Sequence, residues 1–229
     1  MTRQIVLCGG GSLAVEVAAL LRDLDASGRG DGDGFAVTDV VAPGPVRAAD
    51  LTAICGSPFA THADIAGVPD RDRKVFIVCT GDPTVRHKVY RELVGLDLTL
   101  ARIVHPMAYT APTAVIGPGA IIYPGVYVGP FVQLGANVLL HAQVAVHHDA
   151  RLDASVVLSP GALLCGHTAC GTAAFLGTGA SILPKVTLGA YSKLSAGSVL
   201  RRSVGDGCLM HGNPAIVRRT WHIATDEAE

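Results

Sequence analysis

The sequence predicts an α/β chain in two parts, a small parallel-sheet domain followed by a β-helix of six-residue repeats. Three observations lead to this prediction. A large aliphatic residue returns at every sixth position through the second half of the chain. The first hundred residues instead alternate short apolar strands with helical patterns. Only 5% of residues are aromatic although 49% are hydrophobic, so the core must consist of small and branched aliphatic side chains. We expect an α/β domain over residues 1–104, a β-helix over residues 105–219 and a tail over residues 220–229.

The six-residue repeat runs from Ile116 to Leu194 without a break. Thirteen of the fourteen residues at this spacing are Leu, Ile or Val, the exception is Cys170, and a small or β-branched residue follows each of them four positions later. Side chains of a strand alternate between its two faces, so a unit of one short strand and one corner returns the same face inward every six residues. Three units make one triangular coil, and successive coils stack about 4.8 Å apart as parallel strands.

Two further features of the repeat bear on this prediction. Glycine directly follows the large aliphatic residue at six positions, where we expect its permissive backbone to suit the turn: 117, 129, 135, 171, 177 and 189. An ordinary β-sandwich, the alternative architecture, would space its strands by about 8–12 residues. The constant period of six therefore favours the β-helix, although the period alone does not give its handedness.

The first hundred residues predict a different architecture. Apolar strands are expected at Gln4–Leu7, Phe35–Val41 and Lys74–Cys79. Helices are expected at Leu13–Leu24, with Ser12 as its N-cap, and from about Thr84 to Leu93. Strands that alternate with helices are typical of a small Rossmann-like parallel sheet.

A glycine-rich turn after the first strand, residues 8–12, is a candidate phosphate cradle. A helix N-terminus offers free N–H groups and partial positive charge to an anion. The dinucleotide pattern G-x-G-x-x-G is incomplete, because Gly9 and Gly11 are present but the last position is Ala14. Asp39 lies near the position of a ribose-binding acid without completing that pattern, so a tight turn without a ligand stays equally open.

Composition excludes several classes of function. The net charge of −1 argues against a nucleic-acid partner. The six cysteines form no C-x-x-C pair and are expected to be reduced, buried residues of a cytoplasmic protein. No apolar run reaches about 18 residues, so no membrane span is expected. The first residues lead into a strand-like run, which does not resemble a signal peptide.

Polar residues that interrupt the repeat are the candidates for chemistry: His141, His147, His148, Asp149 and His167. His148 and His167 are 19 residues apart, which puts them on adjacent coils. An imidazole titrates near neutral pH and could act as a general base, and a neighbouring carboxylate could orient it. Two other interpretations stay open, solvated corner residues and a zinc site made by histidines of neighbouring coils.

Five segments carry a resemblance to a known family, and they are spread along nearly the whole chain: residues 9–17, 35–39, 81–86, 103–106 and 211–215. The chain resembles the hexapeptide-repeat sugar O- and N-acyltransferases, which include the sialic acid O-acetyltransferase type and the bacterial nucleotide-amino-sugar N-acetyltransferases. The resemblance implies a left-handed β-helix and a homotrimer with active sites between subunits. It also implies that the N-terminal domain holds a nucleotide sugar and that the β-helix holds acetyl-CoA, the acyl donor.

The resemblance assigns roles to individual residues. His148 matches the catalytic base, Asp149 the acid that raises its basicity, and Gly166 the backbone N–H that stabilises the oxyanion. His167, Thr178 and Ala196 match the acetyl-CoA groove. The matches to the nucleotide-sugar contacts are Gly10, Gly11, Ser12, Thr38, Asp39 and Gly81. No metal is expected.

Some positions depart from the family pattern. A histidine is common in the family where this chain has Leu13, another where it has Val157, and an asparagine where it has His167. These departures leave the acceptor sugar open.

The expected reaction is N-acetylation of a nucleotide-linked amino sugar in surface-glycan or related biosynthesis, by direct transfer. O-acetylation of sialic acid or of another sugar hydroxyl is the nearest alternative. A scaffold that only binds a nucleotide sugar is disfavoured by the intact pair of His148 and Asp149. A zinc carbonic anhydrase of the β-helix type would need three converging histidines, two of them five residues apart, whereas the nearest spacings here are six and one.

Overall fold

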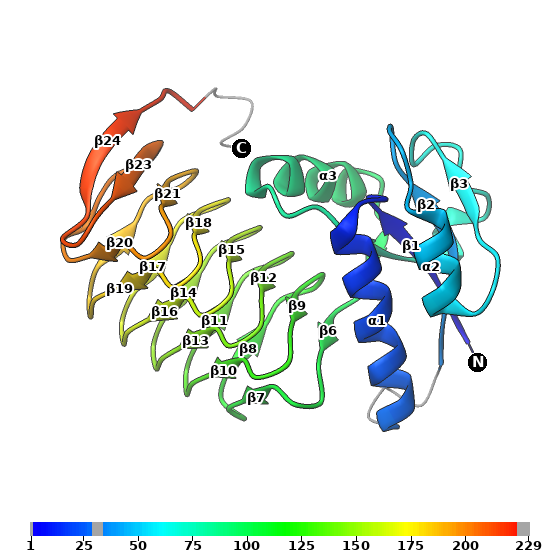
Figure 1. Cartoon of the computed structure of the whole chain (residues 1–229), viewed down its shortest axis with the longest axis horizontal. Coiled ribbons are helices and arrows are strands. Elements are labelled where there is room, and N and C mark those ends of the chain that lie inside the picture. The colour runs from blue at the N-terminus through cyan, green and yellow to red at the C-terminus, as the bar shows by residue number, and fades with distance from the viewer. Residues whose placement is uncertain (1, 29–33, 224–229) are drawn as a thin grey trace.

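The computed structural model describes residues 2–28 and 34–223, which form an α/β domain and a parallel β-helix at opposite ends of the molecule (Figure 1). The α/β domain has a five-stranded parallel sheet in the order β3-β2-β1-β4-β5. Its strands are β1 (Arg3–Cys8), β2 (Phe35–Val41), β3 (Ala60–His62), β4 (Val75–Val78) and β5 (Thr99–Leu100). Its helices are α1 (Ser12–Ser27), α2 (Ala48–Cys55), α3 (Pro83–Gly95) and a short 3-10 helix at Arg71–Arg73.

The predicted strands and both predicted helices of this domain are confirmed, whereas α2, β3 and β5 were not predicted. The prediction that Ser12 caps α1 is wrong. The N-cap is Gly11, Ser12 is the first helical residue, and no side chain caps the helix. The glycine-rich turn therefore continues up to the helix and leaves its first N–H groups uncovered by a side chain.

The β-helix consists of three sheets, one on each face of a triangular prism, and all their strands are parallel except the last, β24. The first sheet contains β6 (Ile103–Val104), β9 (Ile121–Ile122), β12 (Leu139–Leu140), β15 (Val157–Leu158), β18 (Phe175–Leu176), β21 (Lys193–Leu194), β23 (Cys208–His211) and β24 (Ile216–Thr220). The second contains β7 (Tyr109–Thr110), β10 (Tyr127–Val128), β13 (Ala145–Val146), β16 (Leu163–Leu164), β19 (Ser181–Ile182) and β22 (Val199–Leu200). The third contains β8 (Val115–Ile116), β11 (Gln133–Leu134), β14 (Arg151–Leu152), β17 (Ala169–Cys170) and β20 (Thr187–Leu188).

The predicted six-residue phase is confirmed, because residues 18 apart pair in register, as Leu134 does with Leu152. The large aliphatic residue of almost every unit is buried inside the prism. β6 pairs with β9, so strand pairing of the β-helix begins just before residue 105. Of the predicted tail, residues 220–223 are described, and residues 224–229 lie outside the described part of the chain.

The expected role of the glycine after each large aliphatic residue is wrong. The positive φ of each corner falls two residues later, as at Gly119 (φ 72°) and Asn137 (φ 58°). The earlier glycine is required because coils approach closely. A Cβ on Gly117 would lie 2.6 Å from the carbonyl carbon of Gly135 in the next coil. These glycines therefore allow the stacking of coils and do not set the turn conformation.

The C-terminal end of the β-helix is covered by a hairpin. β23 pairs in parallel with β21, and β24 returns antiparallel to β23. The other two sheets are also covered, because the N–H of Val199 donates to the carbonyl of Gly212 (3.0 Å) and the N–H of Gly189 to that of Val204 (3.0 Å). The last coil therefore leaves few free backbone groups.

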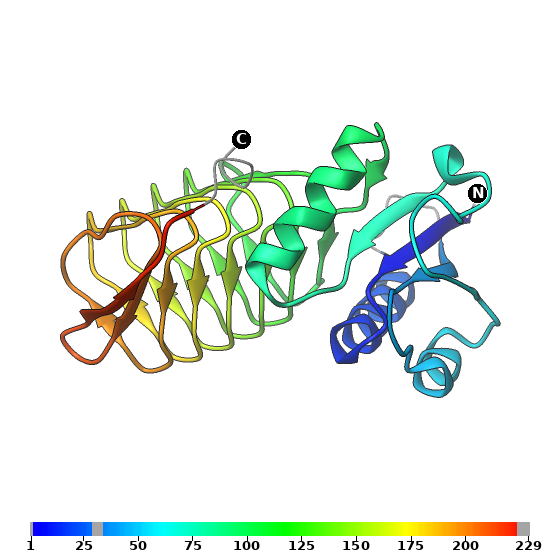
Figure 2. The same ribbon diagram turned by 90° about the horizontal axis from the view of Figure 1, so that it is seen from above.

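Helix α3 joins the two parts, and it lies alongside the β-helix (Figure 2). Arg86 is fully buried at this junction. Its Nε donates to the carbonyl of Asn137 (2.7 Å) and its Nη1 to that of Val78 (2.7 Å). The next residue, His87, contacts the following coil, where its Nδ1 lies 3.1 Å from Ser155 Oγ. These buried polar contacts fix the α/β domain against one corner of the coils.

All six cysteines are free. The expectation that they are buried holds for four of them and is wrong for Cys55 and Cys165, which are half-buried.

Among the described residues, no helix is long and apolar enough to cross a membrane.

Candidate active site

His148 and Asp149 occupy the corner between the second and third sheets, in the turn from β13 to β14. Asp149 has a positive φ of 58°, a conformation that aspartate tolerates better than most residues. Its N–H donates to the carbonyl of Pro130 (3.0 Å), which fixes the turn. In this geometry Asp149 Oδ2 lies 2.8 Å from His148 Nδ1. Both side chains are about half exposed, so a substrate can reach them.

Gly166 lies one coil further on, directly under the His148 ring. A Cβ on Gly166 would lie 2.5 Å from His148 Cε1 and 2.6 Å from its Nε2. Only a glycine therefore allows the ring this position. Within the described chain, the N–H of Gly166 donates no hydrogen bond. An imidazole nitrogen and a backbone N–H, neither of them hydrogen-bonded within the described chain, thus lie on the same corner of neighbouring coils.

His167 lies in the same corner, stacked one coil beyond Asp149. Its Nε2 is 3.7 Å from Asp149 Oδ2, and its ring packs edge-on against that of His148 with centroids 5.3 Å apart. Ligand atoms of His148, Asp149 and His167 lie within 4.8 Å of one another, so this group could hold a metal ion. Two histidines and one carboxylate differ from the three histidines that the carbonic anhydrase alternative requires.

Thr178 and Ala196 lie on a different corner, between the first and second sheets. The structure does not bring them to His148 within one chain. They are exposed and stacked one coil apart, and the N–H of Gly197 donates to the carbonyl of Thr178 (2.9 Å). Within the described residues, the N–H groups of Thr178 and Ala196 have no acceptor. These two exposed N–H groups lie one coil apart on the same corner.

Four of the six predicted nucleotide contacts, Gly10, Gly11, Ser12 and Gly81, lie at the carboxyl edge of the α/β sheet. The strand order reverses between β1 and β4, which is the point where open α/β sheets bind ligands. Gly11, Ser12 and Gly81 are exposed at this edge. Gly10 is buried instead. Val46 packs against it so closely that a Cβ on Gly10 would lie 2.8 Å from Cγ2 of Val46.

Thr38 and Asp39 lie within β2, short of that edge. Asp39 is 2% exposed and contacts Lys74 Nζ (2.6 Å), His62 Nε2 (2.8 Å) and the Thr38 hydroxyl (2.7 Å). Burial raises the pKa of Asp39, but hydrogen bonds from Lys74, Thr38 and His62 outweigh it, and the net pKa is lowered. A ribose would have to compete with these partners for the carboxylate.

A third polar group, which the sequence did not predict as a site, lies where the two parts meet. The Tyr123 hydroxyl donates to Glu16 Oε2 (2.9 Å), and the rings of Tyr123 and His141 pack with centroids 4.9 Å apart. Tyr123 and His141 are 18 residues apart and share one position of neighbouring coils. That spacing was the available signal for their contact, but no sequence pattern links them to Glu16 on α1.

Comparisons with known proteins support the class that this architecture indicates. The family model for bacterial transferase hexapeptide repeats (six repeats) matches residues 113–148. No match was found among curated proteins. The structure of PerB from Caulobacter crescentus, in complex with CoA and GDP-perosamine, is 28% identical, with a TM-score of 0.78 over 94% of this chain and 97% of that chain.

Two further structures cover the chain. The acetyltransferase domain of PglB from Neisseria gonorrhoeae is 28% identical, with a TM-score of 0.77 over 94% of this chain and 100% of that domain. WeeI from Acinetobacter baumannii is 19% identical, with a TM-score of 0.65 over 94% of this chain and 100% of that one, and supports the fold alone. The predicted left-handed β-helix and the resemblance to hexapeptide-repeat sugar acyltransferases are confirmed. The chain is an acyltransferase by class.

Proposed function

We propose that this chain is an acetyl-CoA-dependent N-acetyltransferase that acts on a nucleotide-linked amino sugar in surface-glycan or related biosynthesis. The observation that carries the proposal is the pair of His148 and Asp149, with the imidazole held over the open backbone of Gly166. A mutant of the GDP-perosamine N-acetyltransferase from Caulobacter crescentus, which is 28% identical over 94% of this chain, was likewise solved with CoA and GDP-perosamine. A structure of the PglB acetyltransferase domain contains acetyl coenzyme A.

The proposed reaction is direct transfer. Asp149 accepts a hydrogen bond from Nδ1–H of His148, which leaves the lone pair on Nε2 free to act as a base. Nε2 removes a proton from the acceptor amine as the amine attacks the thioester carbonyl of acetyl-CoA. The tetrahedral intermediate collapses, the carbon–sulfur bond breaks, and coenzyme A leaves as a thiolate that takes up a proton.

Gly166 supplies the proposed oxyanion donor. Its N–H is free within the described chain and lies beside the base, so it can donate to the carbonyl oxygen as negative charge develops. A preorganised donor of this kind lowers the activation free energy of acyl transfer by about 2.7–4 kcal/mol. No cysteine nucleophile is required, and the inward-facing Cys170 is fully buried, where burial raises the pKa of its thiol to about 12.

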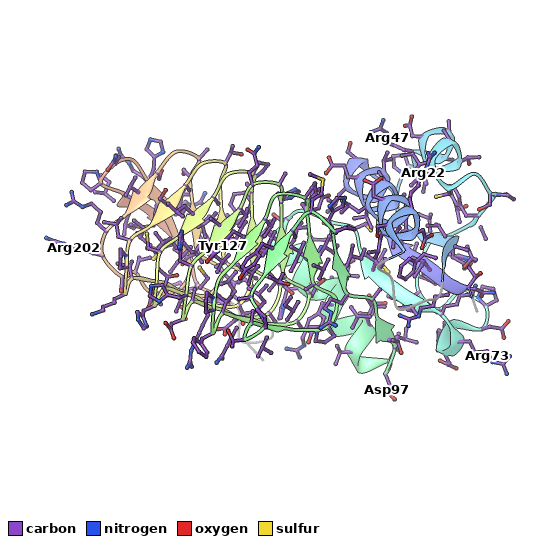
Figure 3. All side chains as sticks on the ribbon, turned by 90° about the horizontal axis from the view of Figure 1, so that it is seen from below. Arg22, Arg47, Arg73, Asp97, Tyr127 and Arg202 are labelled. Atoms are coloured by element: carbon purple, nitrogen blue, oxygen red, sulfur yellow. The ribbon has the colours of Figure 1, made fainter. Side chains whose placement is uncertain are left out.

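We also propose a homotrimer, because the residues of one site lie on two corners of the coil. His148, Asp149 and Gly166 occupy one corner, while Thr178 and Ala196 occupy another. Two subunits packed side by side would bring these corners together. Exposed apolar side chains support a contact next to the catalytic corner: Tyr109 and Tyr127 stack on the second sheet with centroids 5.3 Å apart, and Phe131 is 61% exposed. Tyr127 is labelled on this face in Figure 3.

Acetyl-CoA is proposed to lie along the groove between subunits, against the N–H groups of Thr178 and Ala196 and beside His167. Arg202 extends at the end of the β-helix away from the α/β domain (Figure 3). It continues the column of His148 and Gly166 at the 18-residue period, two coils beyond Gly166, which is about 10 Å. Arg201, Arg202 and Pro214 help to line a cavity of about 500 Å³ there. Arg202 is thus three coils, or about 14 Å, beyond the base, where a guanidinium group suits the phosphates of coenzyme A.

The nucleotide of the acceptor is proposed to bind at the carboxyl edge of the α/β sheet. The N-terminus of α1 offers N–H groups and partial positive charge beside Gly11 and Ser12, and Gly81 is open in the loop between β4 and α3. Gly10 is proposed to contribute to the same turn through its buried backbone, which packs closely against Val46. Thr38 and Asp39 are proposed to contribute through the buried network around Lys74. We further propose that the enzyme is cytoplasmic, which its free cysteines and its acyl donor support.

A thiol-release assay tests this function. Acetyl-CoA is supplied with a panel of UDP-, GDP- and dTDP-linked amino sugars, and with CMP-sialic acid and free sialic acid as hydroxyl acceptors. We expect release with at least one amino sugar and an amide in the product by mass spectrometry, both lost in His148→Ala. Release with sialic acid alone would favour O-acetylation. Absence of acetyl-CoA binding would overturn the enzyme assignment.

A further inference from the structure

We propose that Glu16, Tyr123 and His141 form the subsite for the sugar ring of the acceptor. We also propose that the base acting on a sugar bound there is His148 of a neighbouring subunit. This inference rests on the proposed function and names the part of the site that would select an amino sugar. These three residues are called the junction cluster below.

The junction cluster lies between the two proposed ligand sites. Glu16 is on α1, little more than one turn after the exposed Ser12 of the nucleotide edge. Tyr123 and His141 are on the corner between the first and second sheets, which continues along the coils to Thr178. A ligand with its nucleotide at Ser12 and its reactive group near the acetyl donor would therefore have its sugar at this cluster.

The polar groups of the cluster have unused capacity for hydrogen bonds. Glu16 is exposed, and within the described residues only its Oε2 accepts a bond, the one from Tyr123. His141 is half-buried, and no described residue bonds to either of its ring nitrogens. Both ring nitrogens of His141 are therefore open to hydrogen bonds with a ligand. Burial also lowers the pKa of His141, which favours the neutral ring that can both donate and accept.

The charge of the cluster defines the kind of sugar. Glu16 supplies a carboxylate, and Tyr123 and His141 supply neutral groups. A carboxylate attracts the ammonium form of an amino sugar and its hydroxyl donors, and it repels the carboxylate of a sialic or uronic acid. The junction cluster therefore favours an amino sugar over an acidic sugar, the two acceptor classes between which the sequence did not decide.

The geometry of a trimer indicates which base would face the junction cluster. Within one chain, His141 and His148 lie on neighbouring corners of the same coil. In a three-fold assembly whose axis is parallel to the β-helix, equivalent residues have equal heights along the axis. His148 follows His141 by seven residues of an 18-residue coil, so the neighbour's base would lie only about 2 Å beyond the height of His141. That height matches the junction cluster and not the end of the groove at Ala196.

Mixed trimers test the arrangement. His148→Ala and His141→Ala are each expected to have little activity, and co-assembled from equal amounts they should recover about a quarter of wild-type activity, because one site in four receives both intact halves. The matched control mixes His148→Ala with Asp149→Ala, which damage the same half and should recover nothing. Recovery no greater than in this control would overturn the assignment of His141 to the neighbour's site, as would full activity of His141→Ala alone.

Glu16→Gln tests the choice of sugar and keeps the acceptor atom for Tyr123. We expect KM for the amino sugar to rise about tenfold, with KM for acetyl-CoA unchanged. The relative rate with acidic sugars should rise. Unchanged KM for the amino sugar in an active enzyme would overturn the subsite and leave the proposed function standing. A wild-type enzyme without transfer to any acceptor would instead overturn the proposed function, and this inference with it.

Discussion

Gly166→Ala separates the fold from the chemistry of the catalytic corner. The added Cβ would lie 2.5 Å from Cε1 and 2.6 Å from Nε2 of His148, and an ordinary contact needs about 3.5 Å. The ring must therefore move by about 1 Å. The backbone of Gly166 has no positive φ, so alanine causes no backbone strain there. The atoms that have to move belong to a half-exposed side chain, so the effect on stability should be small.

A base displaced by 1 Å is expected to lose about 10²-fold in rate. The measurement is kcat from steady-state thiol release, together with the melting temperature from thermal unfolding. We expect kcat to fall by about 10²-fold, with a melting temperature within a few degrees of the wild type. Gly205→Ala is the matched control, because that position also lacks a positive φ and an added Cβ meets no atom within 4 Å. It should keep both properties.

The reasoning would be refuted by a Gly166→Ala enzyme that keeps kcat within a few-fold while it remains folded. In that case the position of the imidazole over Gly166 would not matter for catalysis. A large fall in melting temperature would point to a different error, since the coil would then depend on Gly166 for its stacking, as it does on Gly117.

Three other changes have defined outcomes. Asp149→Asn should lower kcat by about 10²-fold or more, measured by thiol release, because an amide can hold His148 in the tautomer whose Nε2 carries the proton. Asp39→Asn should lower the free energy of unfolding at pH 7 by about 3–5 kcal/mol, because it leaves Lys74 buried without its partner. The pKa of Asp39 is lowered from 3.8, so this stability is present above about pH 4 and is lost as pH falls through the lower folded value. Urea unfolding should therefore show that wild type and variant converge at low pH. Prolonged dialysis against a chelator should leave thiol release unchanged, and a loss restored by zinc would contradict the metal-free mechanism.

The β-helix could be predicted because its pattern is local and repeated. Each strand pairs with the one 18 residues later, so a single period fixes sheet membership, register and the inward face together. The same period predicted that His148 and His167 lie on adjacent coils. The structure confirms this placement and shows in addition that their rings pack together. The close approach of coils at Gly117 was not predictable in this way, because it depends on the distance between two backbones and not on the conformation of one.

Contacts between the two parts of the chain escaped prediction for a related reason. Arg86 is separated by 51 residues from Asn137, whose carbonyl it binds, and no repeat or motif links them. Tyr123 and Glu16 are 107 residues apart. Such contacts depend on how α3 and α1 pack on the coils. The sequence of neither helix indicates this packing. Short elements without strong periodicity, such as α2 and β3, were missed because a few apolar residues do not distinguish a helix from a loop.

The covered end of the β-helix has a consequence for self-assembly. A parallel β-helix has no natural stopping point, because its last coil offers the same backbone groups as every coil before it. Here β24 runs antiparallel across that end, and the segment around Gly212 takes up the hydrogen bonds of Val199. The α/β domain occupies the other end. Because β24 is antiparallel to the coils, the parallel pairing pattern does not continue past it, and this disfavours growth into filaments by end-to-end stacking of coils.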